Sequence, residues 1–196
     1  MRKAVQQRTL ETRARLTDVA QALITEKGFG ALRIEEVVLR AGVAKGTFFA
    51  HFADKDELMD LLIGDRINAE LDRQAAAAPP QNADELAQYL LPLLELMASE
   101  RYVFDVILRR SGAAAMEEIG PIATTFERMG QVWGPWLATG EFRKDVPVEL
   151  LVEGVQALVL QTLALHFCAL HQHQPMRDRL LPYLRAWLGP FSPPPR

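Results

Sequence analysis

The stretch from Ile34 to Lys55 constrains the fold of this chain more than any other. Apolar residues within 34–41 recur at helical spacing and predict a short helix with one apolar face. Gly42 follows directly, where a chain leaving a helix needs a positive φ angle that glycine reaches at little cost. A second short helix is expected over residues 45–51. Two short helices joined by a tight turn predict a helix-turn-helix, whose second helix enters the major groove of DNA.

The same stretch carries the residues through which the chain resembles the TetR family of bacterial transcription regulators. In that family an alanine–glycine–valine–serine turn precedes lysine–glycine–threonine, a tyrosine and a histidine–phenylalanine pair, and a lysine follows. The resemblance spans roughly residues 9–64 and implies an all-α protein with an N-terminal three-helix, helix-turn-helix head that binds DNA. It also implies a larger helical domain for ligand binding and dimerisation. The matching residues are Val37-Val38, Ala41-Gly42-Val43-Ala44, Lys45-Gly46-Thr47-Phe48-Phe49-Ala50-His51-Phe52 and Lys55.

The helical pattern divides the chain into a head over residues 1–53 and a larger domain over residues 54–196. Asp54 and Glu57 form a capping-box pattern that opens a connecting helix over about 54–74. Gly64, inside this helix, is a candidate weak point. The other elements expected are a loose arm over 1–8, helices over 9–27, 83–99, 101–110, 121–138, 147–171 and 176–188, and a disordered tail over 189–196.

The charge is distributed unevenly along the chain. The net charge of −3 argues against a nucleic-acid partner when it is taken alone. Residues 1–56, however, hold 10 Lys and Arg against 7 Asp and Glu, whereas the remainder holds 12 against 18. A basic front and an acidic back are expected when only one end of a protein meets phosphate.

Several features favour a soluble, cytoplasmic protein. Cys168 is the single cysteine, which excludes an intramolecular disulfide and suits a reducing compartment. The N-terminus has no apolar segment of the secretory kind. The longest apolar stretch, over residues 150–170, is interrupted by polar residues, so no membrane span is expected.

The residues expected to face DNA lie in and around the second short helix. Lys45 offers a charge to phosphate, Thr47 offers a hydroxyl donor, and His51 can donate from either ring nitrogen. The resemblance implies phosphate-facing roles for these positions. The full set of predicted DNA-contacting residues is Arg33, Lys45, Gly46, Thr47, Phe49, Ala50, His51 and Lys55.

The chain departs from the family pattern at four of these positions or beside them. Phe49 replaces the tyrosine, so the phenolic phosphate contact is lost. Ala44 replaces a serine N-cap that is typically worth ~1 kcal/mol. Arg33 stands where a capping serine or threonine is usual, yet it can reach phosphate itself. Ala50 limits base reading from that position to apolar contact, such as with a thymine methyl group.

The middle helices carry large aromatic residues and methionines. Such residues line pockets for apolar or amphipathic ligands, although at helical spacing they fit a plain core equally well. The sequence therefore leaves open whether they contact a small-molecule effector. The candidate ligand-binding residues are Met97, Phe104, Phe126, Met129, Trp133, Trp136 and His166.

The last two helices are the predicted homodimer interface. A helix that is apolar nearly all round must be buried on two sides, one of which can face a partner copy. A two-fold dimer would place two recognition helices about one DNA turn apart, as a palindromic operator requires. The candidate interface residues are Leu151, Val155, Leu158, Val159, Thr162, Leu180, Leu184 and Trp187.

A cluster of metal-binding residue types is disfavoured by geometry. His166, Cys168, His171 and His173 lie within eight residues. On an intact helix the first and last of them lie about two turns apart, ~10 Å, so the four cannot meet one ion. Histidines near a helix C-terminus also interact well with its dipole. We expect no metal and no cofactor.

Together these patterns predict a ligand-responsive DNA-binding regulator, and the resemblance implies a repressor. A small, largely apolar effector would shift the connecting helix over 54–74 and change the spacing of the two recognition helices. The alternative is a helical small-molecule-binding protein whose DNA-binding head is weakened, which Ala44 and Phe49 favour. The sequence carries no glycine-rich phosphate loop, nucleophile elbow or H-E-x-x-H pair, so an enzyme is not expected.

Overall fold

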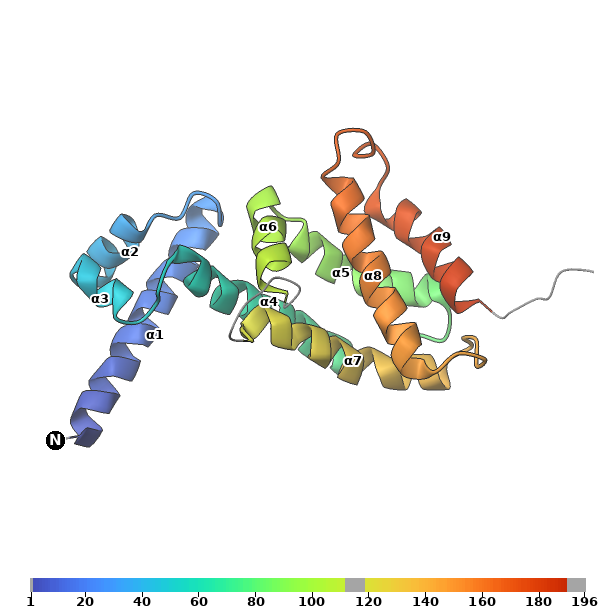
Figure 1. Cartoon of the computed structure of the whole chain (residues 1–196), viewed down its shortest axis with the longest axis horizontal. Coiled ribbons are helices and arrows are strands. Elements are labelled where there is room, and N and C mark those ends of the chain that lie inside the picture. Colours follow the sequence, from blue (N-terminus) through green and yellow to red (C-terminus); the bar gives the residue numbers. More distant parts are fainter. Residues whose placement is uncertain (1, 112–118, 190–196) are drawn as a thin grey trace, which may run out of the picture.

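The computed structural model describes residues 2–111 and 119–189, and side chains from Gln6 onward. Within these residues the fold is all-α, as predicted. The molecule is elongated, with α1, α2 and α3 forming a head at one end and α8 and α9 lying at the other (Figure 1). The helices are α1 (Arg2–Lys27), α2 (Ile34–Ala41), α3 (Lys45–Phe49), α4 (Lys55–Ala76), α5 (Ala83–Met97), α6 (Arg101–Arg110), α7 (Pro121–Thr139), α8 (Val148–His166) and α9 (Met176–Leu188).

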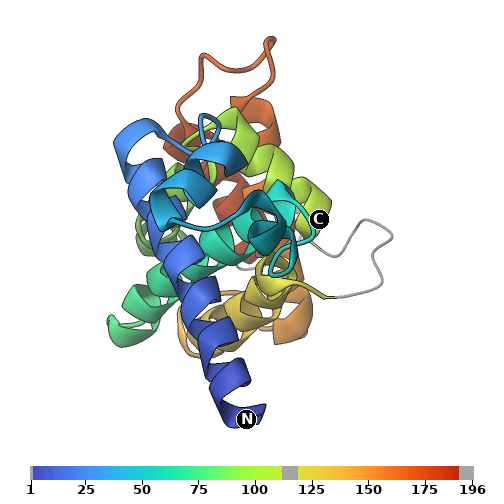
Figure 2. The same ribbon diagram turned by 90° about the vertical axis from the view of Figure 1, so that its left-hand side faces the viewer.

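Helix α4 connects the head to the rest of the chain, which we call the body (α5–α9). Figure 2 views the molecule from the head end, with α1 in front. The N-cap of α4 is Asp54, whose side chain accepts a hydrogen bond from the Glu57 amide at 2.8 Å. Glu57 Oε2 accepts in return from the amide of Ala53, the residue before the N-cap, at 2.6 Å, so the predicted capping box forms with its return bond shifted by one residue.

The turn between α2 and α3 also forms as predicted. Gly42 has a φ of 66° and a ψ of 38°, the left-handed conformation that glycine adopts without a steric penalty. Its amide and that of Val43 bond back to carbonyls of α2, at Leu39 and Val38. The chain therefore leaves α2 sharply enough for α3 to pack against it.

Two helix boundaries differ from the prediction by five residues or more. Helix α1 begins at Arg2, so the prediction of a loose arm over residues 1–8 is wrong for the described residues. This segment is rich in helix-forming Arg, Lys, Ala and Gln, and Gln7 Nε2 donates to Glu11 Oε1 one turn on at 3.0 Å. Residues 190–196 of the expected disordered tail lie outside the described part of the chain.

Helix α8 ends at His166, five residues before its predicted end at residue 171. The Cys168 amide bonds to the Leu165 carbonyl at 3.2 Å, which tightens the last turn, and residues 169–175 are exposed. A run of polar His and Gln residues has no apolar face to bury, so nothing in the core extends the helix.

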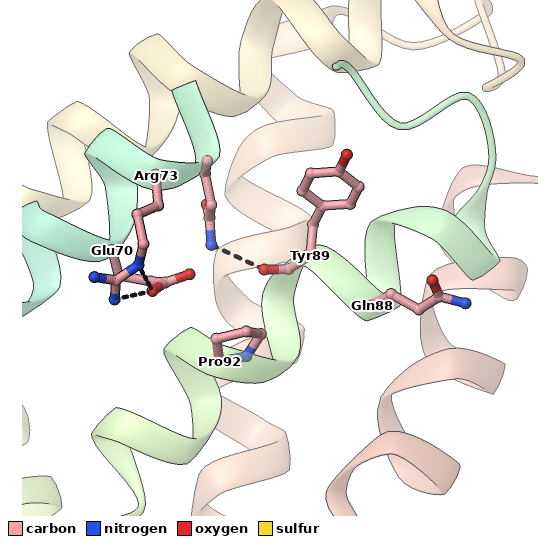
Figure 3. Close-up of a pocket in the computed structure, with 6 residues that line it drawn as sticks. Glu70, Arg73, Gln88, Tyr89 and Pro92 are labelled. Carbon is pink, nitrogen blue, oxygen red and sulfur yellow. Dashed lines mark hydrogen bonds and ion pairs between the residues drawn. The ribbon is translucent and has the colours of Figure 1, made fainter. Parts of the chain in front are cut away.

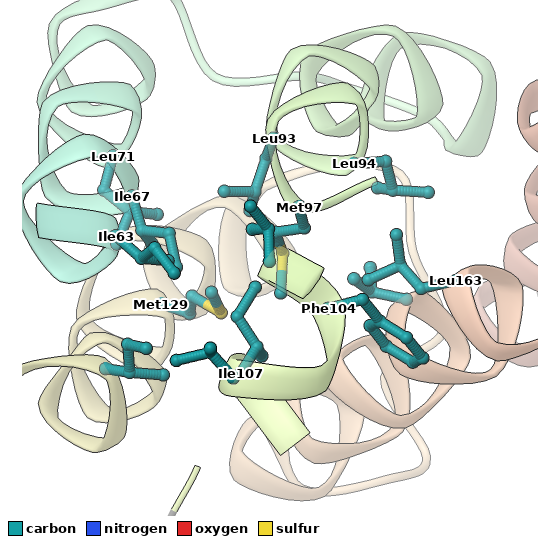
Figure 4. Packing of buried hydrophobic residues seen from close by; sticks show 14 of the residues in the cluster. Ile63, Ile67, Leu71, Leu93, Leu94, Met97, Phe104, Ile107, Met129 and Leu163 are labelled. Carbon is teal, nitrogen blue, oxygen red and sulfur yellow. The ribbon is translucent and has the colours of Figure 1, made fainter. Parts of the chain in front are cut away.

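The body is built around a continuous apolar core. Figure 4 shows side chains of α4, α5, α6, α7 and α8 meeting there, including Ile63, Leu93 and Ile107. Helix α4 packs closely on α7 at Gly64, where a Cβ would lie 2.8 Å from the Pro121 Cβ. Gly64 is buried at this close approach, where a larger side chain would collide with Pro121. The glycine is therefore explained by helix packing and not by a need for a weak point in α4.

One helix of the described residues, Val148–His166, is long and apolar enough to cross a membrane. It packs against α7 and α9 inside the body. The central helix of a helical bundle meets the same criterion, so the finding is weak evidence for a membrane span.

Candidate nucleic-acid interface and its connection to the body

The head holds α3 in place through an aromatic core and one arginine. Phe48 and Phe52 are buried with ring centroids 5.4 Å apart. Arg13 of α1 stacks over the Phe52 ring at 4.1 Å and donates a hydrogen bond to the His51 carbonyl. The recognition helix is therefore fixed from beneath, which leaves its outer face available.

Most of the predicted DNA-contacting residues lie on the surface of the head. Arg33, Lys45, Gly46 and Ala50 are exposed, whereas Thr47 and His51 are half-buried. Phe49 is 47% exposed, an unusual position for a large aromatic residue. Seven of the eight predicted positions, Phe49 included, are therefore exposed or half-buried, and they lie at the start of α2, on α3 and directly after α3.

Lys55, the eighth position, faces the junction with the body. Its ammonium lies 4.4 Å from the centroid of the Tyr102 ring and 3.5 Å from the Gly30 carbonyl oxygen. Partial burial lowers the pKa of Lys55, and Arg33 lowers it further, whereas Asp56 and Glu100 act in the opposite direction. In this conformation Lys55 contacts α6 rather than presenting its charge to solvent.

The sequence did not reveal that Lys45 has a partner on the same face. Lys45 Nζ lies 2.6 Å from Glu35 Oε1 of α2, and both side chains are exposed. The Lys45 hydrogen bond lowers the pKa of the Glu35 carboxyl, and the Coulombic attraction adds to this. A carboxylate beside the principal phosphate-binding candidate opposes the approach of DNA and can also accept a hydrogen bond from cytosine N4.

The two unusual helix starts behave as the sequence predicts. Arg33 occupies the N-cap of α2 and Ala44 the N-cap of α3, and both have extended backbones. Neither side chain accepts a capping hydrogen bond from the amides described for its helix. At the start of α3 the Thr47 amide bonds instead to the Ala44 carbonyl, at 2.9 Å.

A carboxylate from the body clamps the loop between α1 and α2. Glu100, which precedes α6, accepts hydrogen bonds from the Phe29 amide at 2.6 Å and from the Gly30 amide at 2.8 Å. Gly28 adopts a φ of 87° beside it, and a Cβ there would lie 2.6 Å from Glu100 Oε1. The glycines of this loop let the backbone approach the carboxylate closely.

A second polar contact joins the N-terminus of α4 to α6. Asp56 accepts from the Tyr102 hydroxyl at 3.0 Å and from Arg109 Nη2 at 2.7 Å. Burial raises the pKa of the Tyr102 hydroxyl, and the nearby Asp56 charge adds to the shift. Tyr102 therefore stays protonated and acts as a donor.

Asp60 extends this junction toward α7. It is 2% exposed and accepts from the Ile122 amide in the first turn of α7 at 2.8 Å, so it caps a helix other than its own. Arg110 lies 4.0 Å away, and it also reaches Asp54 at 3.5 Å. Burial raises the pKa of Asp60, although the Ile122 amide and Arg110 partly offset the effect.

The predicted ligand-binding residues mostly belong to the packed core. Met97, Phe104, Met129, Trp133 and Trp136 are each at most 4% exposed. Trp133 donates its indole N–H to Gln74 Oε1 at 2.9 Å, and Phe104 stacks on Phe167. The interpretation as plain core fits these five residues better, because they pack against each other and do not line any of the cavities described below. His166, the C-terminal residue of α8, is half-buried with its ring against Phe167.

Three cavities open between helices of the body or between the body and α4. One of about 440 Å³ lies between α4 and α5, one of about 580 Å³ lies between α7 and α8, and one of about 390 Å³ lies between α8 and α9. Phe126 lines the α7–α8 cavity, together with the carboxylates of Glu127, Glu149 and Glu153. It is the one predicted ligand-binding residue found in these three cavities of the described chain.

The predicted dimer residues divide into two groups. Within the single chain, the first group is buried in the core of the body and is not available to a partner copy. It consists of Leu151, Val155, Val159, Thr162, Leu180 and Leu184. Leu158 and Trp187 form the second group, which is half-buried and lines the α8–α9 cavity with Gly154, Ala157, Tyr183 and Ala186.

The histidine and cysteine cluster does not assemble a metal site. Within the described part of the chain, no group of three or more His, Cys, Asp or Glu side chains is arranged to hold a metal ion. His166 ends α8, whereas His171 and His173 lie in the exposed turn beyond it, so the early end of the helix separates the residues.

The head matches a known family of regulators. The family described as "Bacterial regulatory proteins, tetR family" matches residues 16–62, which cover the end of α1, the two short helices and the start of α4. The chain belongs to the TetR family. The match falls on the Gly42 turn, the recognition helix and the Asp54 cap.

Curated relatives of this TetR-family chain are named as transcription regulators. The repressor BepR of Brucella suis is 28% identical over 134 residues, covering 65% of this chain and 62% of BepR. The repressor KstR of Mycobacterium tuberculosis is 29% identical over 146 residues, covering 69% of this chain and 62% of KstR. The alignments thus span less than two thirds of the length of these relatives.

Solved structures share the whole fold. FadR of Thermus thermophilus, a TetR-family repressor in complex with lauroyl-CoA, aligns with a TM-score of 0.66 at 19% identity, covering 94% of this chain and 99% of FadR. RolR in complex with resorcinol aligns with a TM-score of 0.60 at 21% identity, covering 91% and 90%. At these identities the likeness establishes the fold alone.

Proposed function

We propose that this TetR-family protein is a homodimeric, ligand-responsive DNA-binding regulator that acts as a repressor and is released from a palindromic operator by a small, largely apolar molecule. The observation that carries the proposal is the outer surface of α2 and α3, where the charged side chains of Arg33 and Lys45 are exposed. This surface suits phosphate, and the relatives named above are repressors. We place the protein in the cytoplasm and assign it no enzymatic activity.

The proposed release mechanism runs through the junction between head and body. Glu100, Asp56 and Asp60 tie the α1–α2 loop and α4 to α6 and α7. An effector that prefers one arrangement of these helices would shift the head by its difference in affinity for the two arrangements. In a two-fold dimer, that shift changes the distance between the recognition helices, which must match successive turns of the major groove.

We place the dimer interface on the outer face of α8 and α9. Gly154, Ala157 and Ala186 keep this face flat beside the half-buried Leu158 and Trp187. Small residues allow helices of a partner copy to approach closely. An Ala157→Arg variant is expected to sediment as a monomer, whereas Ala69→Arg, on the exposed side of α4, is expected to remain a dimer. A dimeric Ala157→Arg variant would place the interface elsewhere.

The test of DNA binding is a selection of genomic fragments with the purified protein, followed by anisotropy titration of the best fragment at several salt concentrations. Tight binding to a palindrome, with affinity falling steeply as salt rises, is expected. Lys45→Gln should weaken binding to all sequences and reduce the salt slope by about 1. Arg177→Gln, which removes an exposed charge from α9, should change neither quantity.

Weak binding that is indifferent to sequence would support the alternative, a helical small-molecule-binding protein with a weakened head. Ala44, Phe49 and the Glu35 carboxylate beside Lys45 are the observations that favour it. Ala44 and Phe49 lack the hydroxyl groups of the family pattern, and the Glu35 carboxylate adds a negative charge beside Lys45.

A further inference from the structure

The cavity between α4 and α5 differs from the other two because buried polar groups form its floor. It has a volume of about 440 Å³, enough for a small aromatic molecule. Figure 3 shows its walls, with one helix contributing charged residues and the other contributing a proline and an aromatic ring. The lining residues are Glu70, Arg73, Gln74, Gln88, Tyr89 and Pro92.

Glu70 is a buried carboxylate that uses only one of its oxygens. The residue is 4% exposed. Its Oε2 accepts from Arg73 Nε at 2.8 Å and also from Arg73 Nη2. Among the described residues Oε1 has no hydrogen-bond donor, and Figure 3 shows this oxygen turned away from Arg73. Oε1 is not one of the enclosed atoms that lack a partner, so it is reached from the cavity, where a bound molecule can donate to it.

Pro92 creates a second acceptor on the opposite wall. A proline inside a helix has no N–H, so the carbonyl of the residue four positions earlier loses its helical donor. That carbonyl belongs to Gln88. Residues four apart share a helix face, so the Gln88 carbonyl lies on the wall that Pro92 lines.

The other buried polar side chain of the floor, Gln74, already has a hydrogen-bond partner at both its nitrogen and its oxygen. Gln74 donates from Nε2 to the Tyr89 carbonyl at 3.0 Å and accepts at Oε1 from the Trp133 indole at 2.9 Å. It therefore fixes the relative positions of α4, α5 and α7 and offers little to a ligand. The floor is left with two acceptors, Glu70 Oε1 and the Gln88 carbonyl, and the Arg73 guanidinium is at the exposed rim.

The walls provide an apolar surface of matching size. The half-buried Tyr89 ring packs edge-on against Trp136 with centroids 5.6 Å apart, which holds its orientation. The Pro92 ring lies on the same helix one turn further on. A flat ring can lie against these two side chains while its substituent points to the polar floor.

We propose that the α4–α5 cavity is an effector site for an aromatic organic cation, an amine or amidine whose N–H groups donate to Glu70 Oε1 and the Gln88 carbonyl. The inference rests on the proposed function, because it supplies that function with the site and the chemical class of its effector. It also explains how the signal reaches the head. Glu70 and Gln74 belong to α4, so an occupant acts directly on the helix that joins body and head.

The test uses the full-length protein without DNA and four probes: benzamidine and tryptamine, with benzamide and indole-3-propionate as ring-matched molecules that lack the cation. Isothermal titration calorimetry is expected to detect the two cations and to detect neither control. Glu70→Gln should weaken cation binding about tenfold or more, because a charged hydrogen bond is lost. Glu95→Gln, which changes an exposed carboxylate of α5 that does not line the cavity, is the control and should bind like the wild type.

Pro92→Ala provides an independent variant, since it restores the N–H that the Gln88 carbonyl lacks and removes that acceptor from the cavity. Weaker cation binding is expected, together with an unchanged or higher melting temperature. Equal binding of the cations to wild type and Glu70→Gln, or no binding by the wild type, would overturn the proposal. Operator binding without cation binding would reject the site and keep the regulator. Cation binding without operator binding would keep the site and reject the regulator.

Discussion

The interior of the body and its junction with the head are held together by different forces. The interior is a continuous set of apolar side chains from α4 to α9, with Trp133 completely buried. The junction depends instead on the carboxylates of Glu100, Asp56 and Asp60, which accept hydrogen bonds from amides, a phenol and arginines. The junction can therefore rearrange by exchanging a few polar partners with water, whereas the interior cannot open without exposing apolar surface.

The largest effect is expected when the interior is disrupted. Trp133→Ala removes a fully buried indole and the hydrogen bond to Gln74, so the free energy of unfolding should fall by about 3–5 kcal/mol. Urea denaturation followed by circular dichroism measures this change. The control Leu39→Ala, at a residue 80% exposed on α2, should change stability by no more than about 0.5 kcal/mol. Similar losses for the two variants would contradict the contrast.

A smaller and local effect is expected at the junction. Glu100→Gln keeps one acceptor oxygen but loses the charge that holds the Phe29 and Gly30 amides. Opening of this loop should become easier by about 1–2 kcal/mol, which raises amide exchange there roughly tenfold. Hydrogen exchange read at these two amides measures the effect. Exchange in α7 should be unchanged, and an equal increase in both regions would mean that the junction and the interior open together.

The junction should also respond to pH through Asp60. Burial raises the pKa of this carboxyl above its ordinary value of 3.8, so the folded protein binds the proton more tightly than the unfolded chain does. The contribution of Asp60 to stability is then largest below that value and falls as pH rises through the window above it. Asp60→Asn should flatten the curve of unfolding free energy as pH rises above about 4. An unchanged curve would show that Asp60 titrates normally.

The smallest effect is expected on the DNA-binding surface. Glu35→Gln removes the exposed partner of Lys45, so the variant should bind operator more tightly, with a salt slope steeper by about 1. Its stability should match that of the wild type. Anisotropy titration against the operator and a scrambled duplex measures both affinity and selectivity. Weaker operator binding by the variant would indicate that Glu35 reads a base directly.

The head was predictable from the sequence because its determinants are local. Gly42, the Asp54–Glu57 capping box and the uncapped Arg33 and Ala44 act within a few residues of their own position. The junction was not predictable in the same way. Glu100 meets Phe29 across 71 residues and Tyr102 meets Asp56 across 46, and no periodic pattern marks such pairs.

The sequence predicted the helices of the body but not which of their faces are buried and which line a cavity. Aromatic residues at helical spacing fit a core and a pocket equally well, and packing against α4 assigns Trp133 to the core. Similarly, α8 is apolar on several sides, and only its position between α7 and α9 determines that Val155 faces inward while Leu158 lines the outer cavity. Glu70 and Pro92 gave separate local signals, yet their meeting across one cavity depends on how α4 and α5 pack.

The most direct test of a polar junction that sets the position of the head is the distance between the two heads in the proposed homodimer. A spin label at Leu39→Cys, in a Cys168→Ser background, reports this distance by double electron–electron resonance. We predict one narrow distribution for the otherwise unchanged protein and a clearly broader one when Glu100→Gln is added. Identical distributions with and without Glu100→Gln would contradict the account, because the head would then be positioned by α4 alone.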